Sequence, residues 1–189
     1  MTGSPHFDVS TDEAGVVWIT MDVEGKSVNV MTQAVTADFC AIIDEIAAHP
    51  PTGLVFRSGK ARGFIFGADV NEFADFKTRR EVEAHIRPVL RCFQQIEHMP
   101  CPTVVLIDGI CVGGGLELAM AFSRIIGIDS PGCQVGFPEI NLGLLPGYGG
   151  SARAYSRPGL EGALKPVLEG KSLKARDAPT LGGLDHLRG

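Results

Sequence analysis

Apolar residues recur along the chain in short stretches whose spacing predicts an alternation of strands and helices. Residues 16–23 are rich in β-branched side chains and predict a strand, and residues 53–57 and 103–107 predict two more. Between residues 32 and 49, apolar side chains at helical spacing predict a helix that two prolines end. This alternation favours a mixed α/β fold, in which residues 1–189 form a single domain.

A second, longer helical pattern runs from about residue 70 to residue 99. Pro88 lies inside it, and we expect this proline to interrupt or kink the helix because proline lacks the backbone N–H donor. Further predicted elements are a helix at about 116–122, two short strands at 125–128 and 134–137, and helical pieces from Ser151 onward.

Composition is that of a folded protein with ordinary surface charge. Apolar residues make up 44% of the 189 positions and charged residues 21%. The formal net charge of −5 and the lack of a basic stripe argue against binding of nucleic acid. No apolar run reaches the length of a membrane span, and no basic segment followed by an apolar one opens the chain. We therefore expect a cytoplasmic protein without a membrane partner.

Cysteine and histidine positions do not indicate a metal site. The five cysteines are an odd number without C-x-x-C spacing, which favours reduced core thiols over a disulfide framework or a zinc site. The five histidines are scattered, and we expect most of them at the surface. The spacing of these residues thus gives no indication of a metal site.

Two familiar glycine motifs occur as strings but lack their structural context. Gly147-x-Gly149-x-x-Ala152 fits the dinucleotide-binding pattern, yet a poor strand precedes it. The two Gly-Lys-Ser triplets at 25–27 and 170–172 lack the earlier glycine of a phosphate-binding loop. We therefore set both interpretations aside.

Two glycine-rich stretches each follow an apolar strand and lead into a predicted helix. They are FIFGADV (64–70) and DGICVGGGLELAM (108–120). In a purely structural interpretation both are tight connectors, with Asp69 near a helix N-cap. Alternatively, the glycines leave backbone N–H groups at a helix start without intrahelical partners, and such groups favour negative charge. Two of them, from separate loops, could hold a developing enolate oxygen.

Two acids in apolar surroundings accompany these loops. Glu117 lies in LELAM (116–120), where an unpaired buried carboxylate would be costly, so a salt bridge or partial exposure is the structural alternative. Glu139 follows Pro138, where an acid can simply favour a helix N-terminus. Paired acids beside an oxyanion site suit proton transfer at carbons next to a thioester carbonyl.

Three segments together resemble the enoyl-CoA hydratase/isomerase (crotonase) family. They are GFIFGADVNEF (63–73), CPTVVLIDGICVGGGLELAM (101–120) and GFPEINLGLLPGYGGSAR (136–153). The resemblance extends from about residue 16 to residue 186 and is closest to bacterial fatty-acid oxidation hydratases. It implies an α/β fold built as a spiral of β-β-α units that binds acyl-CoA.

The resemblance also implies roles for individual residues. The backbone N–H groups of Ala68 and Gly114 would form the oxyanion hole, and Glu117 and Glu139 would be the catalytic acids. Glu117 would help to activate a water for attack at Cβ, and Glu139 would exchange a proton at Cα. The implied contacts with the substrate and its coenzyme A part are Lys26, Val28, Val30, Gly67, Ala68, Asp69 and Gly114.

Retention of both acids favours hydration of a 2-enoyl-CoA to a 3-hydroxyacyl-CoA over isomerisation of a 3-enoyl-CoA, which remains the alternative. Coenzyme A belongs to the substrate, so no separate cofactor is implied. The family usually forms homotrimers or dimers of trimers, and we expect the same here.

The end of the sequence departs from the family pattern. LGGLDHLRG (181–189) stands where members continue into further helices that cover the acyl pocket and build the trimer. The expected fold therefore lacks most of the usual C-terminal helices. This departure raises another possibility, a crotonase-like protein with little catalytic activity that acts in binding or interaction.

Overall fold

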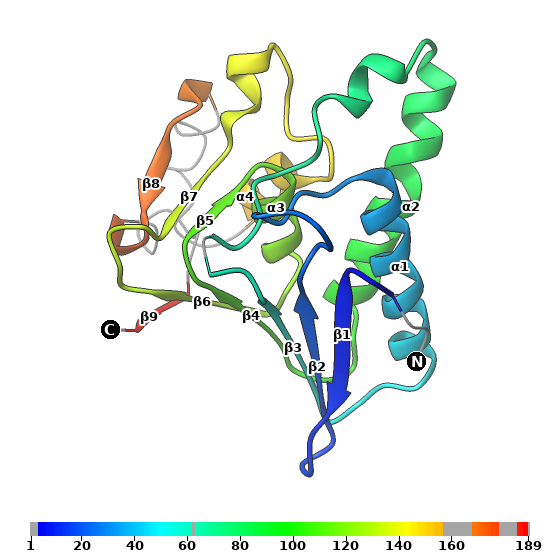
Figure 1. Cartoon of the computed structure of the whole chain (residues 1–189), viewed down its shortest axis with the longest axis vertical. Helices are drawn as coiled ribbons and strands as arrows, with labels where there is room; N and C mark the ends of the chain where they lie inside the picture. Colours follow the sequence, from blue (N-terminus) through cyan, green and yellow to red (C-terminus); the bar gives the residue numbers. More distant parts are fainter. Residues whose placement is uncertain (1–3, 62, 157–167, 178–184, 189) are drawn as a thin grey trace.

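The fold is built on one large sheet. The computed structural model describes residues 4–61, 63–156, 168–177 and 185–188. Within this part of the chain the large sheet has six strands in the order β1-β2-β3-β4-β6-β9 (Figure 1). They are β1 (Phe7–Thr11), β2 (Val16–Met21), β3 (Gly53–Ser58), β4 (Thr103–Ile107), β6 (Arg124–Ile128) and β9 (His186–Arg188).

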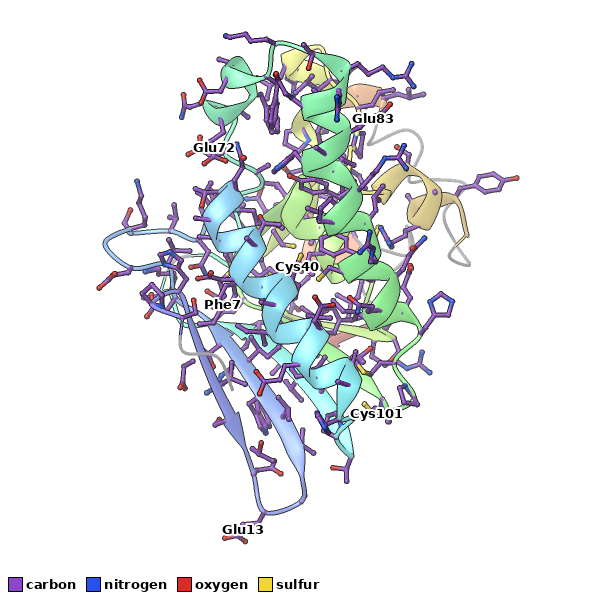
Figure 2. All side chains as sticks on the ribbon, turned by 90° about the vertical axis from the view of Figure 1, so that its right-hand side faces the viewer. Phe7, Glu13, Cys40, Glu72, Glu83 and Cys101 are labelled. Carbon is purple, nitrogen blue, oxygen red and sulfur yellow. The ribbon has the colours of Figure 1, made fainter. Side chains whose placement is uncertain are left out.

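Strand direction explains where the long helices lie. β1 and β2 pair antiparallel, whereas every pair from β2 to β9 is parallel. Parallel neighbours require a crossover connection, and the crossovers after β2 and β3 contain α1 (Gln33–Ala48) and α2 (Arg79–Glu97). Figures 1 and 2 show these two helices side by side along the same side of the sheet. The predicted mixed α/β architecture is thus confirmed.

The first strand was not predicted from the sequence. β1 pairs with β2 so that Phe7 lies opposite Met21, and both side chains are buried. The other β1 side chains are exposed or half-buried, which leaves the apolar alternation of this segment weak. The strand is stabilised by its pairing with β2, a contact that the local pattern does not reveal.

α1 agrees with the prediction, whereas α2 differs from it. The Thr32 hydroxyl caps α1 by accepting a hydrogen bond from the N–H of Val35 (3.2 Å). α2 begins only at residue 79, because Thr78 and Glu81 form a capping box there. Residues 72–75 form a separate 3₁₀ helix.

The expected interruption at Pro88 is wrong, since α2 continues through it to residue 97, and a kink at this position stays a prediction. Pro88 is exposed, so its ring lies on the solvent side of the helix. The buried face next to it keeps α2 in place through packing, which outweighs one missing hydrogen bond. This face consists of Val89, Cys92, Phe93 and Ile96.

A second, smaller sheet lies beside the first. Its order among the described residues is β5-β7-β8, with β5 at Ile110–Val112, β7 at Gln134–Gly136 and β8 at Ser172–Lys174. β8 contradicts the prediction of helical pieces there, because antiparallel pairing with β7 determines its conformation. α4 (Gly150–Ser156) confirms the helical prediction just after residue 150.

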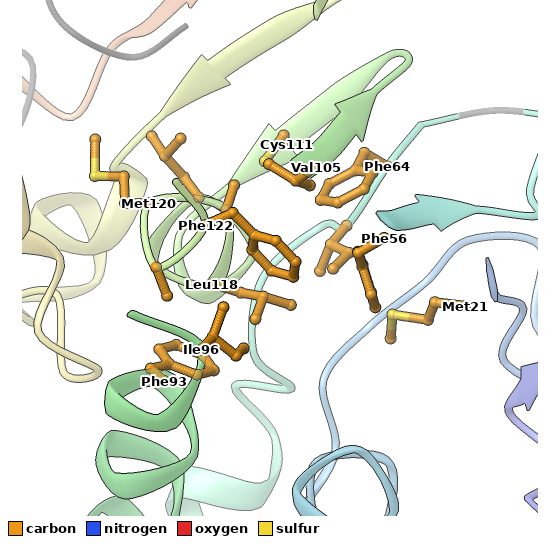
Figure 3. Close-up of a cluster of buried hydrophobic side chains, with 14 of the residues drawn as sticks. Met21, Phe56, Phe64, Phe93, Ile96, Val105, Cys111, Leu118, Met120 and Phe122 are labelled. Carbon is orange, nitrogen blue, oxygen red and sulfur yellow. The ribbon is translucent and has the colours of Figure 1, made fainter. Parts of the chain in front are cut away.

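A short helix, α3 (Gly114–Ala119), occupies the centre of the molecule, and all six of its residues are buried. Figure 3 shows Leu118 and Phe122 among side chains from the large sheet and from α2. The Phe56 ring lies 5.9 Å from the Phe122 ring and 5.6 Å from the Phe64 ring, centroid to centroid. The core therefore holds α3 and both glycine-rich stretches in place.

Candidate active site

A cavity of about 410 Å³ opens beside the N-terminus of α3. Its volume lies within the range of small-molecule sites. Both glycine-rich stretches, α2 and the segment after β7 contribute to its wall. The lining residues are Phe66, Gly67, Ala68, Val70, Phe73, Phe76, Val82, His85, Ile86, Gly113, Gly114, Glu117, Pro138, Glu139, Leu142, Leu144, Leu145, Gly147 and Tyr148.

The first glycine-rich stretch pairs with the segment around Met31. The N–H of Met31 donates to Gly67 O (2.9 Å), and the N–H of Asp69 donates to Met31 O (3.1 Å). In this parallel bridge the bonds are made by the residues on either side of Ala68, so its own N–H points away from Met31. In the described part of the chain, the backbone hydrogen bonds of loops and turns include none that the Ala68 N–H donates.

The second stretch turns sharply into α3 at Gly113. Its φ of +54° lies in the left-handed region, which favours glycine. Gly114 is the first residue of the helix, so its N–H has no intrahelical acceptor. A Cβ atom on Gly114 would lie 3.5 Å from the backbone nitrogen of Ala68. Two backbone nitrogens without helical partners, from separate loops, thus meet at the cavity wall.

Asn29 fixes the position of the first loop. Its fully buried side-chain amide donates to Met21 O (2.9 Å) and Phe64 O (3.1 Å), and its Oδ1 accepts from the N–H of Val23 (3.0 Å). Its backbone oxygen also accepts from the N–H of Phe66 (2.9 Å). Because these bonds are buried, they hold the loop firmly against β2.

Glu117 is a buried carboxylate held by backbone donors. Only 2% of its surface is exposed, and its Oε1 accepts from the N–H groups of Tyr148 (2.7 Å) and Gly150 (2.7 Å). Partial exposure, one of the two structural alternatives for this residue, is therefore excluded. Burial raises the pKa of Glu117 to about 7, and the charge of Glu139 adds to this shift, while the two N–H donors oppose it.

Glu139 lies in the 3₁₀ helix Pro138–Leu142, across the same cavity. Its Oε2 atom is buried and has no hydrogen-bond partner among the described residues. Burial raises the pKa of this carboxyl as well. Such an orphaned oxygen calls for an explanation, and a water or a substrate in the cavity would supply its missing partner.

Arg153 supports the turn that holds Glu117. Its Nη1 donates to Tyr148 O (2.5 Å), and its Nε donates to a carboxylate oxygen of Glu97 (2.7 Å). The guanidinium also lies over the Phe93 ring, 5.5 Å from the centroid. α4 is thereby tied to α2 at the point where Tyr148 donates to Glu117.

Two polar residues of the cavity wall were missed by the sequence prediction. His85 was expected at the surface with most histidines, but it is half-buried and lines the cavity, where it contacts Tyr148. A signal existed, because His85 lies three residues after Val82, on the same apolar face of the helix. Tyr148 lies within Gly147-x-Gly149-x-x-Ala152, the stretch whose interpretation as a dinucleotide-binding motif was set aside.

The implied contacts with coenzyme A lie partly outside this cavity. Lys26 is exposed, Val28 and Val30 are half-buried, and none of the three lines the cavity. Asp69 accepts a hydrogen bond from the N–H of Asn71 (3.0 Å). This bond fits the structural interpretation of Asp69 as a local cap. The role of these four residues in binding coenzyme A stays a prediction.

The described residues contain neither a membrane-spanning helix nor a cluster of metal-ligand side chains. No helix there combines the length and the apolar character needed to cross a bilayer. In the same part of the chain, His, Cys, Asp and Glu side chains nowhere gather into a group of three or more that could hold a metal ion.

The arrangement suits acid–base chemistry on a substrate that becomes an oxyanion. Preorganised N–H donors stabilise negative charge as it develops, most strongly where water is excluded. Carboxyl groups with raised pKa values can give and take protons near neutral pH. Such perturbed groups in a cleft are a physical signature of a functional site.

Comparison with known proteins agrees with the fold and the motifs. A family model described as enoyl-CoA hydratase/isomerase matches residues 11–187. A fatty acid oxidation complex subunit alpha from Aliivibrio fischeri is 37% identical over 187 residues, which cover 98% of this chain. The chain spans 27% of the length of that relative.

Solved structures show the same fold. An enoyl-CoA hydratase from Geobacillus kaustophilus superposes with a TM-score of 0.90 at 25% identity, covering 99% of this chain and 69% of the other. One from Mycobacterium smegmatis gives 0.88 at 20% identity, covering 98% and 71%. Since the family model spans nearly the whole sequence, the chain belongs to the enoyl-CoA hydratase/isomerase family.

Proposed function

We propose that this chain hydrates 2-enoyl-CoA thioesters to 3-hydroxyacyl-CoA. The observation that carries the proposal is the presence of two carboxyl groups with raised pKa values, Glu117 and Glu139, on the wall of one cavity. Ala68 and Gly114 line the same wall, where a Cβ atom on Gly114 would lie 3.5 Å from the backbone nitrogen of Ala68. Family membership and the names of the relatives support the same substrate class.

In the proposed reaction, the thioester oxygen accepts hydrogen bonds from the N–H groups of Ala68 and Gly114. The ionised Glu117 carboxylate takes a proton from a water as the water oxygen bonds to Cβ, and the double-bond electrons move to form an enolate. Glu139 then gives a proton to Cα, which restores the thioester carbonyl. The product gains one water, and a proton must pass from Glu117 to Glu139 before the next turnover.

Isomerisation of a 3-enoyl-CoA is the second candidate. It also proceeds through an enolate in the same oxyanion site, but it moves one proton between two carbons and uses no water. The orphaned Oε2 of Glu139 favours hydration, because a water between the two acids would satisfy it. A crotonase-like protein with little activity is the third candidate.

A direct assay separates these candidates. We expect the chain to convert crotonyl-CoA to 3-hydroxybutyryl-CoA, seen as loss of the conjugated absorbance and verified by mass spectrometry of the product. Conversion of 3-hexenoyl-CoA to 2-hexenoyl-CoA without hydration would favour isomerisation. If neither substrate turned over, while acyl-CoA still bound, the proposed activity would be wrong and the binding role would stand.

The same sample should be measured for its mass in solution, because we also propose a homotrimer or a dimer of trimers. Exposed apolar side chains at the cavity, including Leu142 and Leu145, are suited to burial in such an assembly. A monomer with robust hydratase turnover would refute the assembly while leaving the hydratase proposal intact.

The pH dependence of activity follows from the raised pKa of Glu117. The base Glu117 must be ionised and the acid Glu139 must hold its proton, so kcat/KM for crotonyl-CoA should rise as Glu117 ionises around pH 7 and fall again at higher pH, once Glu139 has lost its proton. Initial rates between pH 5 and 9, at a constant ionic strength, check this directly. A flat profile through neutral pH would contradict the role of Glu117 as the base.

Stability should change in the opposite direction over the same pH window. The pKa of Glu117 in the folded state lies above its ordinary value of 4.5, so the folded state binds more protons between pH 4.5 and about 7. The contribution of this group to the free energy of unfolding therefore falls as pH rises through that window. In Glu117→Gln, urea unfolding should lose this component of the pH dependence, which tests the raised pKa independently of activity.

A further inference from the structure

The wall of the cavity contains a hydrogen-bonded polar pair that the proposed reaction does not use. The Nε2 atom of His85 on α2 lies 2.8 Å from the hydroxyl of Tyr148. Both side chains line the cavity, and their rings are 6.0 Å apart between centroids. The wall around them is apolar and includes Phe73, Phe76, Val82, Ile86 and Leu142.

This pair lies next to the place where the reaction is proposed to occur. The edge of the Tyr148 ring is so close to Gly114 that a Cβ there would lie 3.2 Å from Cε2 of the tyrosine. The hydroxyl oxygen is only two covalent bonds from that ring carbon. A thioester whose oxygen accepts a hydrogen bond from the Gly114 N–H would therefore bind beside the Tyr148 ring, on the wall of the cavity that Tyr148 lines.

The pair keeps unused hydrogen-bonding capacity. A phenol offers one donor and two acceptor positions, and the contact with His85 uses only one of them. If the phenol donates to His85, its oxygen can accept from a hydroxyl group in the cavity. If the other imidazole tautomer donates to the phenol, the phenol can donate to a carbonyl oxygen. Either arrangement suits an uncharged oxygen group.

Electrostatics disfavours a charged group at this point. Burial lowers the pKa of His85, which keeps its ring neutral at physiological pH. Burial also raises the pKa of the Tyr148 hydroxyl, and the charge of Glu117 acts in the same direction. A neutral pair near the Glu117 carboxylate would bind a carboxylate group of a substrate poorly.

We propose that Tyr148 and His85 form a recognition site for a neutral hydroxyl or keto group on the acyl chain of the substrate, just beyond the reacting double bond. The inference rests on the proposed hydratase function and narrows its substrate class to oxygenated 2-enoyl-CoA thioesters. A purely alkyl chain would fill the rest of the wall but would leave the remaining capacity of the pair unused.

A structural role is the competing explanation. The contact between His85 and Tyr148 also joins α2 to the turn that holds Glu117, since the backbone N–H of Tyr148 donates to that carboxylate. Loss of such a tie would affect all substrates alike. Recognition would instead change the ratio between oxygenated and alkyl substrates, so the experiment measures that ratio.

The test compares trans-2-hexenoyl-CoA with its 4-hydroxy, 5-hydroxy and 6-hydroxy analogues. For the parent chain we expect kcat/KM to be about 3- to 10-fold higher for the best hydroxylated analogue, as one additional hydrogen bond between neutral groups allows. In Tyr148→Phe, which keeps the ring but removes the hydroxyl, this ratio should fall to about one. Tyr155→Phe is the matched control and should keep the parent ratio, because Tyr155 is 79% exposed and does not line the cavity.

Several outcomes would overturn the proposal. These are equal kcat/KM values for all four substrates and an unchanged ratio in Tyr148→Phe. If none of the substrates is hydrated, the proposed function fails, and affinity then decides the inference separately. Calorimetric Kd values for hexanoyl-CoA and its hydroxylated analogues should show the same preference in the parent chain and lose it in Tyr148→Phe, and equal Kd values would refute it.

Discussion

Glu117→Gln and Glu139→Gln should each lower the turnover of 2-enoyl-CoA hydration by roughly 10²–10⁴-fold, the usual contribution of a positioned acid or base. Glutamine keeps the size of the side chain but cannot exchange a proton. In Glu117→Gln the amide oxygen can still accept from the N–H groups of Tyr148 and Gly150, so the surrounding turn should persist. Crotonyl-CoA hydration rates give the effect, and acyl-CoA affinity should be largely retained.

The two variants should differ in a second measurement. The proposed mechanism assigns proton exchange at Cα to Glu139 and activation of water to Glu117. Exchange of Cα hydrogen for deuterium in bound butyryl-CoA, followed by NMR, should therefore be lost in Glu139→Gln and retained in Glu117→Gln. The opposite pattern would reverse the two roles.

Glu13→Gln is the matched control. Glu13 is exposed in the turn between β1 and β2, at the lower end of the molecule in Figure 2, and it does not line the cavity. Its substitution makes the same chemical change at the surface and should leave turnover unaltered. Parent-like rates in both Glu117→Gln and Glu139→Gln would remove these residues from the mechanism.

The central part of the site could be predicted because its residues conflict with ordinary packing rules. Gly114 and Gly115 weaken the first turn of α3, and Glu117 places a carboxyl group in the core. Such local conflicts are expected at functional sites, where geometry matters more than stability. The sequence could therefore indicate the chemistry before any distance was known.

Convergence of separate segments could not be predicted in the same way. Neither His85 nor Tyr148 breaks a local rule, and they meet only because α2 crosses over to the turn before α4. The spacing in sequence contains no information about such a contact. Similarly, the two N–H groups that donate to the Glu117 carboxylate belong to Tyr148 and Gly150, more than 30 positions further along the chain.

The errors in the fold have one common cause. β1 and β8 are short strands that are stabilised by pairing with β2 and β7, and their own local patterns are weak. Pro88 was misjudged for the converse reason, since the strong apolar face of α2 holds the helix across a local defect. Tertiary contacts decided each of these cases against the local pattern.

Gly114→Ala should lower kcat/KM for crotonyl-CoA by roughly 10²–10³-fold, the effect of losing one oxyanion donor. The added methyl group would lie 3.5 Å from the Ala68 nitrogen and 3.2 Å from the Tyr148 ring. It would therefore occupy the space that the thioester oxygen needs in order to reach both N–H groups. Alanine is otherwise a good helix residue, so α3 should still form.

Gly132→Ala is the matched control, because a Cβ atom on Gly132 would meet no atom within 4 Å. This variant should keep parent activity, and both variants should unfold at urea concentrations close to that of the parent. A chromophoric cinnamoyl-CoA gives a readout that does not depend on turnover, since polarisation of its carbonyl by the two N–H groups shifts its absorbance to longer wavelength. That shift should be present in the parent and in Gly132→Ala but lost in Gly114→Ala. If Gly114→Ala retained both the shift and the rate, the thioester oxygen would have to bind elsewhere in the cavity.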